Sequence, residues 1–431
     1  MKDSSRTTVF YGNANFSLFH QNVHLLCDPW FEAPSVAGAF EKFPPSSLRL
    51  TDIPKPNLIY ISHIHSDHCE YDTLRALDKT TPVLILQRDP PYLERMVRQH
   101  GFTDIRLIPA HTPTQIAPGF IVETFGAGYP HVCGEVIDSS AVFHWTDWTV
   151  FNGNDNAPLP PFCEDVHQRY PQIDLAFLSC AGGGAYPAMY ENLSLEEQAA
   201  FVEVVKQRKR AIFSQAIDIL QPRVVVPVAG GYALRGQPPS VNWRQCRWLN
   251  LEEVTASHRT HGTHQPVLVP MQPGMVLEDS VVTKGVYHAW THAECEAEFE
   301  RLAQLPILQT LTTTRPVLSL QRLVEIARTR LWVQQEKIGL TPDYTIYLDI
   351  NSLPHLLEMT LKNSYVSLCP RKGFPLTRPY LKMTLSQDTM LEWLLGLEDF
   401  NMLDSGHRIR FFRDPNTYVQ EVYYLMSFLR L

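Results

Sequence analysis

The sequence predicts an α/β protein built of sheet and helix layers, with an α+β appendage at its C-terminal end. Strand-like apolar runs alternate with helical segments over the first part of the chain, and a dense group of His and Asp residues follows one of these strands. Beyond about residue 279 the pattern changes, and longer helical stretches precede a few short strands. We therefore expect one unit over residues 1–278 and a second over residues 279–431.

The composition is that of an ordinary globular protein. Of 431 residues, 44% are hydrophobic and 19% charged, which allows a sizeable core. The formal net charge of −8 does not supply the basic surface that phosphates require, so we expect no nucleic-acid partner. No apolar run approaches the roughly 18 residues that span a bilayer, and the N-terminus lacks the apolar core of a secretory signal. We expect no membrane association and a cytoplasmic location.

The eight cysteines are scattered along the chain without short pair spacings. This distribution is not that of a zinc knuckle or of a disulfide framework. We expect most of them to be buried thiols that pack as small hydrophobic side chains.

The sequence pattern of residues 1–151 predicts strands and short helices arranged in layers. The expected strands are apolar or alternating runs bounded by Gly, Pro, Asn or Gln. The Asp28-Pro29-Trp30 segment forms a turn at the end of the third strand. The expected strands are residues 8–11, 16–19, 23–27, 83–87, 105–108, 120–125, 141–145 and 148–151, with helices near residues 73–77 and 92–99.

The group of potential metal ligands lies where the apolar run from Ile59 gives way to a loop. Successive strand residues point to opposite faces, so His63 and His65, two apart, are expected on the same side. Asp67 and His68 follow before a helix that begins near residue 71. Imidazole and carboxylate groups suit zinc, iron or manganese. Four such residues within six positions favour a metal site over a histidine-rich surface loop.

Two later residues extend this candidate set. His131 follows the strand at 120–125, and Asp155 lies just beyond the strand at 148–151, where a carboxylate is well placed to bridge two metals. Taken alone, Asp155 is better explained as a turn residue, because Asp and Asn favour such loops.

The remaining sequence continues the alternation and then changes. A strand at residues 174–179 ends in a glycine run that is not followed by the Lys of a phosphate loop, and Ser194 with Glu197 forms a capping box that starts a long helix. A further strand, 224–228, ends in Ala229 and Gly230. Past residue 279 we expect helices near 294–303, 320–336, 387–395 and 418–429, and strands near 344–350, 366–368 and 380–384. This unit has no ligand cluster, so we expect it to cover the site, bind substrate or form a dimer.

The His63-Ile64-His65-Ser66-Asp67-His68 string resembles the signature of the metallo-β-lactamase superfamily, which implies an αββα sandwich. The order of clustered ligands, then a single His, then an Asp at a strand end is also the order of ligands in that superfamily. Further segments resemble the metal domain of the CMP-N-acetylneuraminate hydroxylase (sialic-acid monooxygenase) family. These segments are the His string with residues 60–62, then 181–183, 186–189, 218–223, 227–230 and 413–418.

The chain departs from that family in two ways. The family's hydroxylases carry a Rieske cluster held by Cys-x-His and Cys-x-x-His motifs, and nothing before Ile59 supplies them. Many superfamily members also place a final His after the late strand, where Ala229 and Gly230 stand here. The loop histidines 258, 261 and 264 are alternatives for this ligand, although we favour them as solvent-exposed residues. Glu135 is an alternative to His131, which we prefer.

The resemblance implies that residues 1–278 form a catalytic domain with two non-haem irons that activates O2 and hydroxylates a small-molecule substrate. His63, His65 and His131 would hold one iron, Asp67 and His68 the second, and Asp155 would bridge. Electrons would come from an external ferredoxin or reductase. The alternative is a binuclear zinc hydrolase of an ester, thioester, lactone or phosphodiester, in which Asp67 or Asp155 orients a hydroxide. A scaffold with a vestigial site is the weakest hypothesis, because the ligand set is mostly intact.

Overall fold

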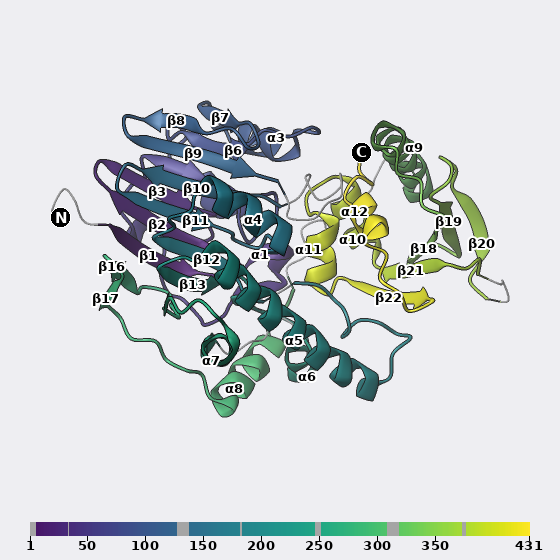
Figure 1. Cartoon of the computed structure of the whole chain (residues 1–431). Coiled ribbons are helices and arrows are strands. Elements are labelled where there is room, and N and C mark those ends of the chain that lie inside the picture. The colour runs from purple at the N-terminus through teal and green to yellow at the C-terminus, as the bar shows by residue number, and fades with distance from the viewer. Residues whose placement is uncertain are drawn as a thin grey trace.

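Two sheets face each other in the first part of the molecule, and helices cover both outer faces (Figure 1). The structure is a computed structural model that describes residues 6–32, 34–126, 138–181, 183–245, 251–307, 319–372 and 376–431. A third, five-stranded sheet with its own helices lies beside this sandwich. The predicted αββα sandwich with a C-terminal α+β appendage is therefore confirmed.

The first sheet has antiparallel strands on one side and parallel strands on the other. Strands β3, β5, β6 and β7 run parallel, so their carboxyl ends lie at one edge of the sheet. The order is β17 (Val281–Lys284), β16 (Val276–Glu278), β1 (Thr7–Gly12), β2 (Asn15–His20), β3 (Val23–Cys27), β5 (Leu58–Tyr60), β6 (Val83–Leu86) and β7 (Ile105–Ile108).

The second sheet has the same mixed character. Strands β11, β12, β13 and β15 run parallel, whereas β8, β9 and β10 are joined antiparallel. The order is β15 (Val267–Leu268), β13 (Val224–Val228), β12 (Leu175–Ser179), β11 (Trp148–Asn152), β10 (Ser140–Trp145), β9 (Phe120–Phe125) and β8 (Thr114–Ala117).

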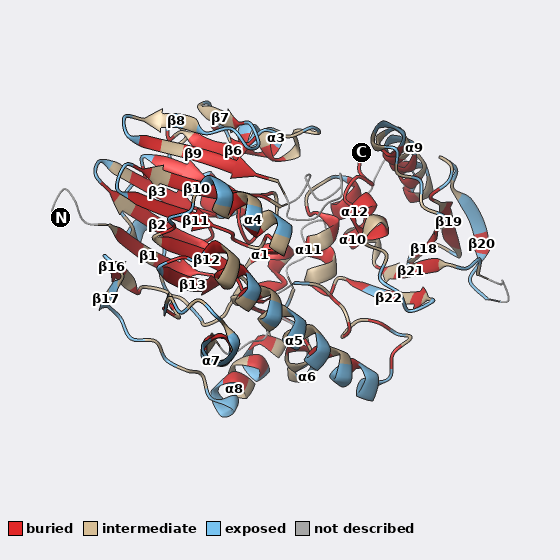
Figure 2. Ribbon diagram, in the orientation of Figure 1, coloured by how far each residue is buried: buried red, intermediate tan, exposed pale blue. Residues whose placement is uncertain are grey.

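Aromatic side chains fill the space between the two sheets. The rings of Phe16 and Phe177 stack with centroids 3.8 Å apart, and Tyr60 meets Phe143 edge to face at 5.3 Å. Such rings bury large apolar areas and fix the two sheets face to face. Figure 2 shows that the strands of the sandwich are mostly buried, which explains their near-continuous apolar sequences.

Helices pack on the outer faces through separate apolar clusters. Helices α2 (Tyr71–Ala76) and α3 (Tyr92–Gln99) cover the first sheet. The second sheet is covered by α4 (Pro160–Arg169), α5 (Leu195–Leu220) and α7 (Leu251–His261). Short elements complete this part: α1 (Ser35–Gly38), a 3-10 turn (Leu50–Asp52), α6 (Pro239–Trp243), α8 (His292–Ala303) and the ribbon of β4 (Phe40–Lys42) with β14 (Tyr232–Leu234).

The C-terminal unit packs its helices on a five-stranded sheet. The order is β20 (Ser367–Pro370), β19 (His355–Thr360), β18 (Thr345–Ile350), β21 (Tyr380–Leu385) and β22 (Ile409–Asp414). Its helices are α9 (Leu320–Ile338), α10 (Gln387–Leu394), α11 (Phe400–Ser405) and α12 (Gln420–Met426). Figure 1 shows α11 between this sheet and the sandwich.

Two features bear on the division of the chain. Beyond residue 278, β17 still pairs with β16, and α8 buries Phe299 against Ala233 of β14. In the other direction, the segment at Tyr190 bridges to Phe411 of β22, and its side chain joins the C-terminal core. The two parts therefore interlock, and the boundary at 278/279 remains a proposal about function.

Two further observations concern the cysteines and the helices. The six cysteines in the described ranges, at positions 27, 69, 163, 180, 295 and 369, are free and buried, as expected. Among the described residues, no helix combines the length and apolar character that crossing a bilayer requires.

Candidate metal centre

The His-rich segment forms a loop between β5 and α2. Strand β5 ends at Tyr60, so His63 and His65 lie beyond the strand. The expectation that strand alternation would place both side chains on one face is therefore wrong. The loop itself brings His63 Nε2 to 2.8 Å from His65 Nδ1. Helix α2 then begins at Tyr71, close to the expected position, with Glu70 as its N-cap.

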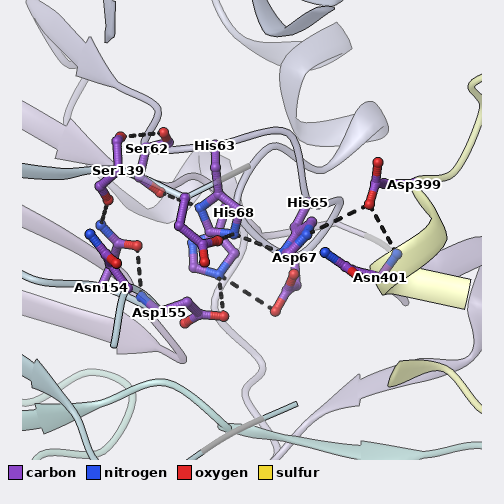
Figure 3. A network of polar contacts seen from close by, with 12 residues as sticks. Ser62, His63, His65, Asp67, His68, Ser139, Asn154, Asp155, Asp399 and Asn401 are labelled. Atoms are coloured by element: carbon purple, nitrogen blue, oxygen red, sulfur yellow. Dashed lines mark hydrogen bonds and ion pairs between the residues drawn. The ribbon is translucent and has the colours of Figure 1, made fainter. Parts of the chain in front are cut away.

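Five of the six predicted ligands converge. His63, His65 and Asp155 each offer one ligand atom within 4.8 Å of the others, and Asp67, His68 and Asp155 form a second such group. Asp155 belongs to both groups, as a bridging ligand would. Figure 3 shows its carboxylate next to His68. His131 and its alternative Glu135 lie outside the described residues, so their assignment remains a prediction.

Buried polar atoms at this point support a metal site. His65 Nε2, Asp67 Oδ1 and Asp155 Oδ1 are buried and lack a hydrogen-bond partner among the described residues, and the buried His68 Nε2 has only its 3.2 Å ion-pair contact with Asp155 Oδ2. Buried polar groups are rarely left unpaired, because their desolvation is costly. For the Asp67, His68 and Asp155 atoms, which lie in the second group, metal coordination would satisfy this need. The donor set therefore fits one or two transition-metal ions.

Asp28 orients two of the histidines through the ring nitrogens that face away from the site, directly for His68 and through Ser62 for His63. Its Oδ2 lies 3.0 Å from His68 Nδ1 and accepts a hydrogen bond from Ser62 Oγ at 2.9 Å, while its Oδ1 accepts from Ser62 N at 2.8 Å. Ser62 Oγ is in turn 2.7 Å from His63 Nδ1. A carboxylate behind a ligating imidazole fixes its tautomer and orientation. Asp28 therefore directs His68 Nε2 and, through Ser62, His63 Nε2 toward the centre.

Asp28 was not predicted as a site residue, although the sequence contained a signal for it. It follows β3, whose parallel neighbour β5 precedes the His string, and Cys27 is paired with Tyr60. The carboxyl ends of parallel neighbours lie side by side at one sheet edge.

Asn13 supports Asp67 from the turn between β1 and β2. Its Nδ2 donates to Asp67 Oδ2 at 2.9 Å, and its Oδ1 accepts from Gly231 N at 3.1 Å. A Cβ on Gly231 would lie 2.8 Å from Asn13 N, so only glycine permits this approach. Asn13, with φ of 55°, adopts the left-handed conformation that Asn tolerates. No motif in the sequence predicted this role.

Asp155 is presented by an Asn-rich turn after β11. Asn154, with φ of 38°, accepts from Asp155 N through its side-chain oxygen at 2.6 Å and donates to Ser139 O. This is turn chemistry that Asn and Asp provide. The turn and the metal-ligand explanations for Asp155 are therefore compatible, because the turn is what aims its carboxylate at His68 Nε2, 3.2 Å away.

A further carboxylate lies beside the first ligand group. Asp138 Oδ1 is 3.8 Å from His63 Nε2, and burial raises the pKa of Asp138, with the charge of Asp155 adding to this effect. Asp138 was not predicted as a site residue, since it precedes β10 without a recognisable motif. It is a candidate additional ligand for a metal that His63 and His65 would hold.

The charges of the site are strongly coupled. Burial, together with His68 and His65, lowers the pKa of His63 well below its usual value, which leaves its lone pair available. Burial opposes the charge on His68, but Asp155, Asp67 and Asp28 together raise its pKa well above the ordinary value. Burial likewise raises the pKa of Asp67. Burial also opposes the ionisation of Asp155, but the nearby His68 outweighs this effect, so the pKa of Asp155 is lowered. A cation in the second group would replace the proton of His68.

A pocket of about 200 Å³ opens onto the ligands. His65, Asp67, Asp138 and Asp155 line one side. The C-terminal unit supplies much of the opposite wall, which is compatible with the expectation that it covers the site or binds substrate. Among the described lining residues, Lys209 of α5 is the only lysine or arginine. The other polar lining residues are Ser179, Tyr232, Asn401, Asp404, Ser405, Tyr418, Tyr423 and Tyr424.

The alternatives for a final His ligand do not reach the site. His258 is buried, contrary to the exposed position expected, and its two ring nitrogens contact Ser214 Oγ at 2.8 Å and His264 O at 2.9 Å. His264 contacts Pro222 O, and His261 remains on the exposed face of α7. Ala229 and Gly230 line the pocket at the end of β13 and offer no side-chain ligand.

Comparisons with known proteins agree with this geometry. Residues 24–213 match the family model described as Beta-lactamase superfamily domain. A protein of Mycolicibacterium smegmatis named as a Rieske 2Fe-2S iron-sulfur protein is 29% identical over 224 residues, covering 51% of this chain and 42% of its own length. The cytidine monophosphate-N-acetylneuraminic acid hydroxylase of Mus musculus is 26% identical over 228 residues, covering 50% of this chain and 37% of its own length.

The match thus spans less than half the length of these curated relatives. Among solved structures, CmlA, a diiron beta-hydroxylase from Streptomyces venezuelae, aligns with a TM-score of 0.44 and 15% identity over 64% of this chain and 54% of that one. The family model, the two facing sheets and the His-x-His-x-Asp-His loop at their edge lead to one assignment. The sandwich has the metallo-β-lactamase fold, and residues 24–213 are similar in sequence to the β-lactamase superfamily domain.

Proposed function

We propose that this chain is a non-haem diiron monooxygenase that hydroxylates a small-molecule substrate. The observation that carries the proposal is the composition of the first ligand group, in which two histidines, His63 and His65, meet one carboxylate, Asp155. Two His and one carboxylate with open positions are a donor set that iron uses in mononuclear non-haem oxygenases, so this group suits iron as one of the two metals, with His131 as a third imidazole. We assign His63, His65 and His131 to one iron, Asp67 and His68 to the second, and Asp155 to both.

Two further observations support oxygen chemistry. The chain is similar in sequence, over half its length, to proteins named as CMP-N-acetylneuraminic acid hydroxylases. In addition, Ala229 and Gly230 line the ligand pocket without offering a side-chain donor. We propose that this side of the centre admits dioxygen or the substrate.

The proposed reaction needs an external source of electrons. Dioxygen supplies one oxygen atom to a C–H bond of the substrate and the other to water, which requires two electrons and two protons. Bound iron would supply the dioxygen activation that side chains lack. Other relatives are named as Rieske iron-sulfur proteins, and we propose that a separate ferredoxin or reductase delivers the electrons here.

The residues of this chain bind and orient. Asp28 and Asn13 hold His68 and Asp67 in place through the contacts described above. Lys209 places a positive charge within the ligand pocket, where it attracts an acidic group of the substrate. The C-terminal wall, with its tyrosine and Asn401 side chains, offers hydrogen bonds to a polar substrate and restricts water.

Metal analysis tests the proposal. Protein purified from iron-supplemented cells should contain about two irons per chain, with the Mössbauer signature of a coupled ferric pair. Single-turnover oxidation of the reduced protein should consume O2. The same donors also suit zinc, whose bound water reaches a pKa of about 7 in hydrolases. Stoichiometric zinc with hydrolysis of generic esters in the absence of O2 would overturn the oxygenase and favour a hydrolase.

A further inference from the structure

The connection between α10 and α11 of the C-terminal unit contacts the metal-binding loop. Tyr71 OH donates to Leu397 O at 3.1 Å, and Ser66 Oγ donates to Glu398 Oε2 at 3.1 Å. The next residue, Asp399, brings its Oδ1 to 4.0 Å from His65 Nε2 (Figure 3). Successive residues from one unit thus follow the loop of the other.

The carboxylate of Asp399 is held in place by its own unit. Arg430 Nη2 donates to Asp399 Oδ2 at 2.6 Å, and Asn401 N donates to Oδ1 at 2.9 Å as Asp399 caps α11. Ser427 Oγ lies 3.4 Å from the same oxygen. Asp399 is only 6% exposed. Capping α11 explains why a polar residue stands here, but Ser, Thr or Asn would cap equally well. The negative charge is paired with Arg430 through Oδ2, and the other oxygen, Oδ1, is the one that faces His65.

His65 presents its two ring nitrogens to different surroundings. Nδ1 lies 2.8 Å from His63 Nε2 and faces the ligand group, whereas Nε2 is buried and has no hydrogen-bond partner among the described residues. A neutral imidazole that binds a metal through Nδ1 carries its proton on Nε2. A fixed negative charge on the Nε2 side stabilises that tautomer electrostatically, even at 4.0 Å, because the surroundings are buried.

We propose that Asp399 is a positioning residue that keeps the proton of His65 on Nε2 and its Nδ1 lone pair toward the metal. The inference rests on the proposed metal centre, but it applies to iron and zinc alike. It gives the C-terminal unit a specific function: it completes the surroundings of a ligand that the sandwich supplies. Substitution at Asp399 should therefore weaken one metal site and leave the Asp67–His68 group intact.

The experiment compares Asp399→Asn with Arg430→Gln. Both substitutions break the ion pair between the two residues, but only the first removes the charge that faces His65. Co²⁺ is titrated into chelator-treated full-length protein in competition with a chromophoric chelator, and the d–d absorption bands report each site. We expect Asp399→Asn to lower the affinity of one site by ~10–100-fold and to shift its bands. Arg430→Gln, which keeps a hydrogen-bond donor beside the Asp399 carboxylate, should lower both affinities by less than Asp399→Asn lowers the affinity of its one site.

The outcomes separate this inference from the proposed function. Wild-type affinity and spectrum in Asp399→Asn would overturn it, as would an equal loss in Arg430→Gln, which would show a structural role only. If the Asn variant does not fold cooperatively, Asp399→Ser retains a good N-cap without the charge and takes its place. Loss of one site in a protein that proves to be a zinc hydrolase would support the positioning role while overturning the oxygenase. Wild-type protein that binds no divalent metal would overturn both.

Discussion

Replacement of Asp28 by Asn is the sharpest test of how this centre is built. Asp28 is fully buried and accepts from three groups: Ser62 N, Ser62 Oγ and the Nδ1–H of His68. Asn has nearly the same shape but only one acceptor oxygen. If that oxygen stays on Ser62 N, the amide NH2 faces His68 Nδ1. His68 must then accept there and carry its proton on Nε2, the atom that lies 3.2 Å from Asp155.

The expected loss follows from this change of tautomer. An Nε2 that carries a proton cannot bind a metal, so the second ligand group loses its only imidazole. His68 could then bind only by adopting the less favourable tautomer, with its proton on Nδ1, and this change costs free energy. Substitution of a carboxylate behind a ligating His typically weakens metal binding ~10–100-fold, or about 1.4–2.7 kcal/mol. We expect a loss in this range for the group formed by Asp67, His68 and Asp155, with a smaller effect on the other metal.

Ser62→Ala provides the matched comparison. It keeps the contact between Asp28 and His68 but removes the hydroxyl that contacts His63 Nδ1. Its main effect should therefore fall on the opposite site. Competition titrations with Co²⁺ and Zn²⁺ measure both affinities, and urea unfolding checks that each variant folds. If Asp28→Asn binds two metals as tightly as wild type, the orientation argument is wrong.

Three further predictions concern the surroundings of the site. Gly231→Ala should lower stability by about 1–3 kcal/mol in urea unfolding, because its Cβ would lie 2.8 Å from Asn13 N; unchanged stability would contradict this contact. His258→Ala should lower stability by about 1–3 kcal/mol but leave the metal content unchanged, and loss of a metal would show that His258 is a ligand. Burial lowers the pKa of His24 to about 4. Because the unfolded chain takes up this proton near pH 6.5, stability should fall by about 3 kcal/mol as the pH drops from 6.5 to 4. Chelator-treated His24→Phe should lack this fall in unfolding free energy between pH 6.5 and 4. An unchanged pH dependence would show that His24 does not cause it.

The parts of the fold that the sequence predicted are those with strong local signals. The apolar runs at residues 23–27, 105–108 and 224–228 coincide with β3, β7 and β13, and the capping box at Ser194 marks the start of α5. Strands β4, β14 and β15, of two or three residues each, carry too little periodicity to be recognised. Strand β17 and helix α8 show a different limit, since they pack against the first unit through partners that the local sequence does not reveal.

The candidate site divides in the same way. The five predicted ligands within the described residues lie on the loops that follow β5 and β11, where chain order and residue type are visible in the sequence. Asp28 was identifiable in principle from the parallel pairing of β3 with β5. Asp399 was not, because it meets His65 only through the docking of two units, and no local pattern reports such a contact.

The way in which these side chains are held explains why the centre needs both units. His63, His65, Asp67 and His68 lie on an irregular loop, and such loops usually lack the rigidity that metal sites require. Here hydrogen bonds from buried side chains hold the loop in place of the backbone hydrogen bonds that a strand would form. Asp28 and Asn13 fix the loop from the first sheet. On the other side Glu398, whose pKa burial raises to about 8, accepts from Ser66 Oγ and from Ala37 N. A carboxyl group buried so completely at the junction of two units stabilises the loop only while those units remain docked. Metal affinity and docking of the C-terminal unit should therefore be thermodynamically linked, so that each strengthens the other.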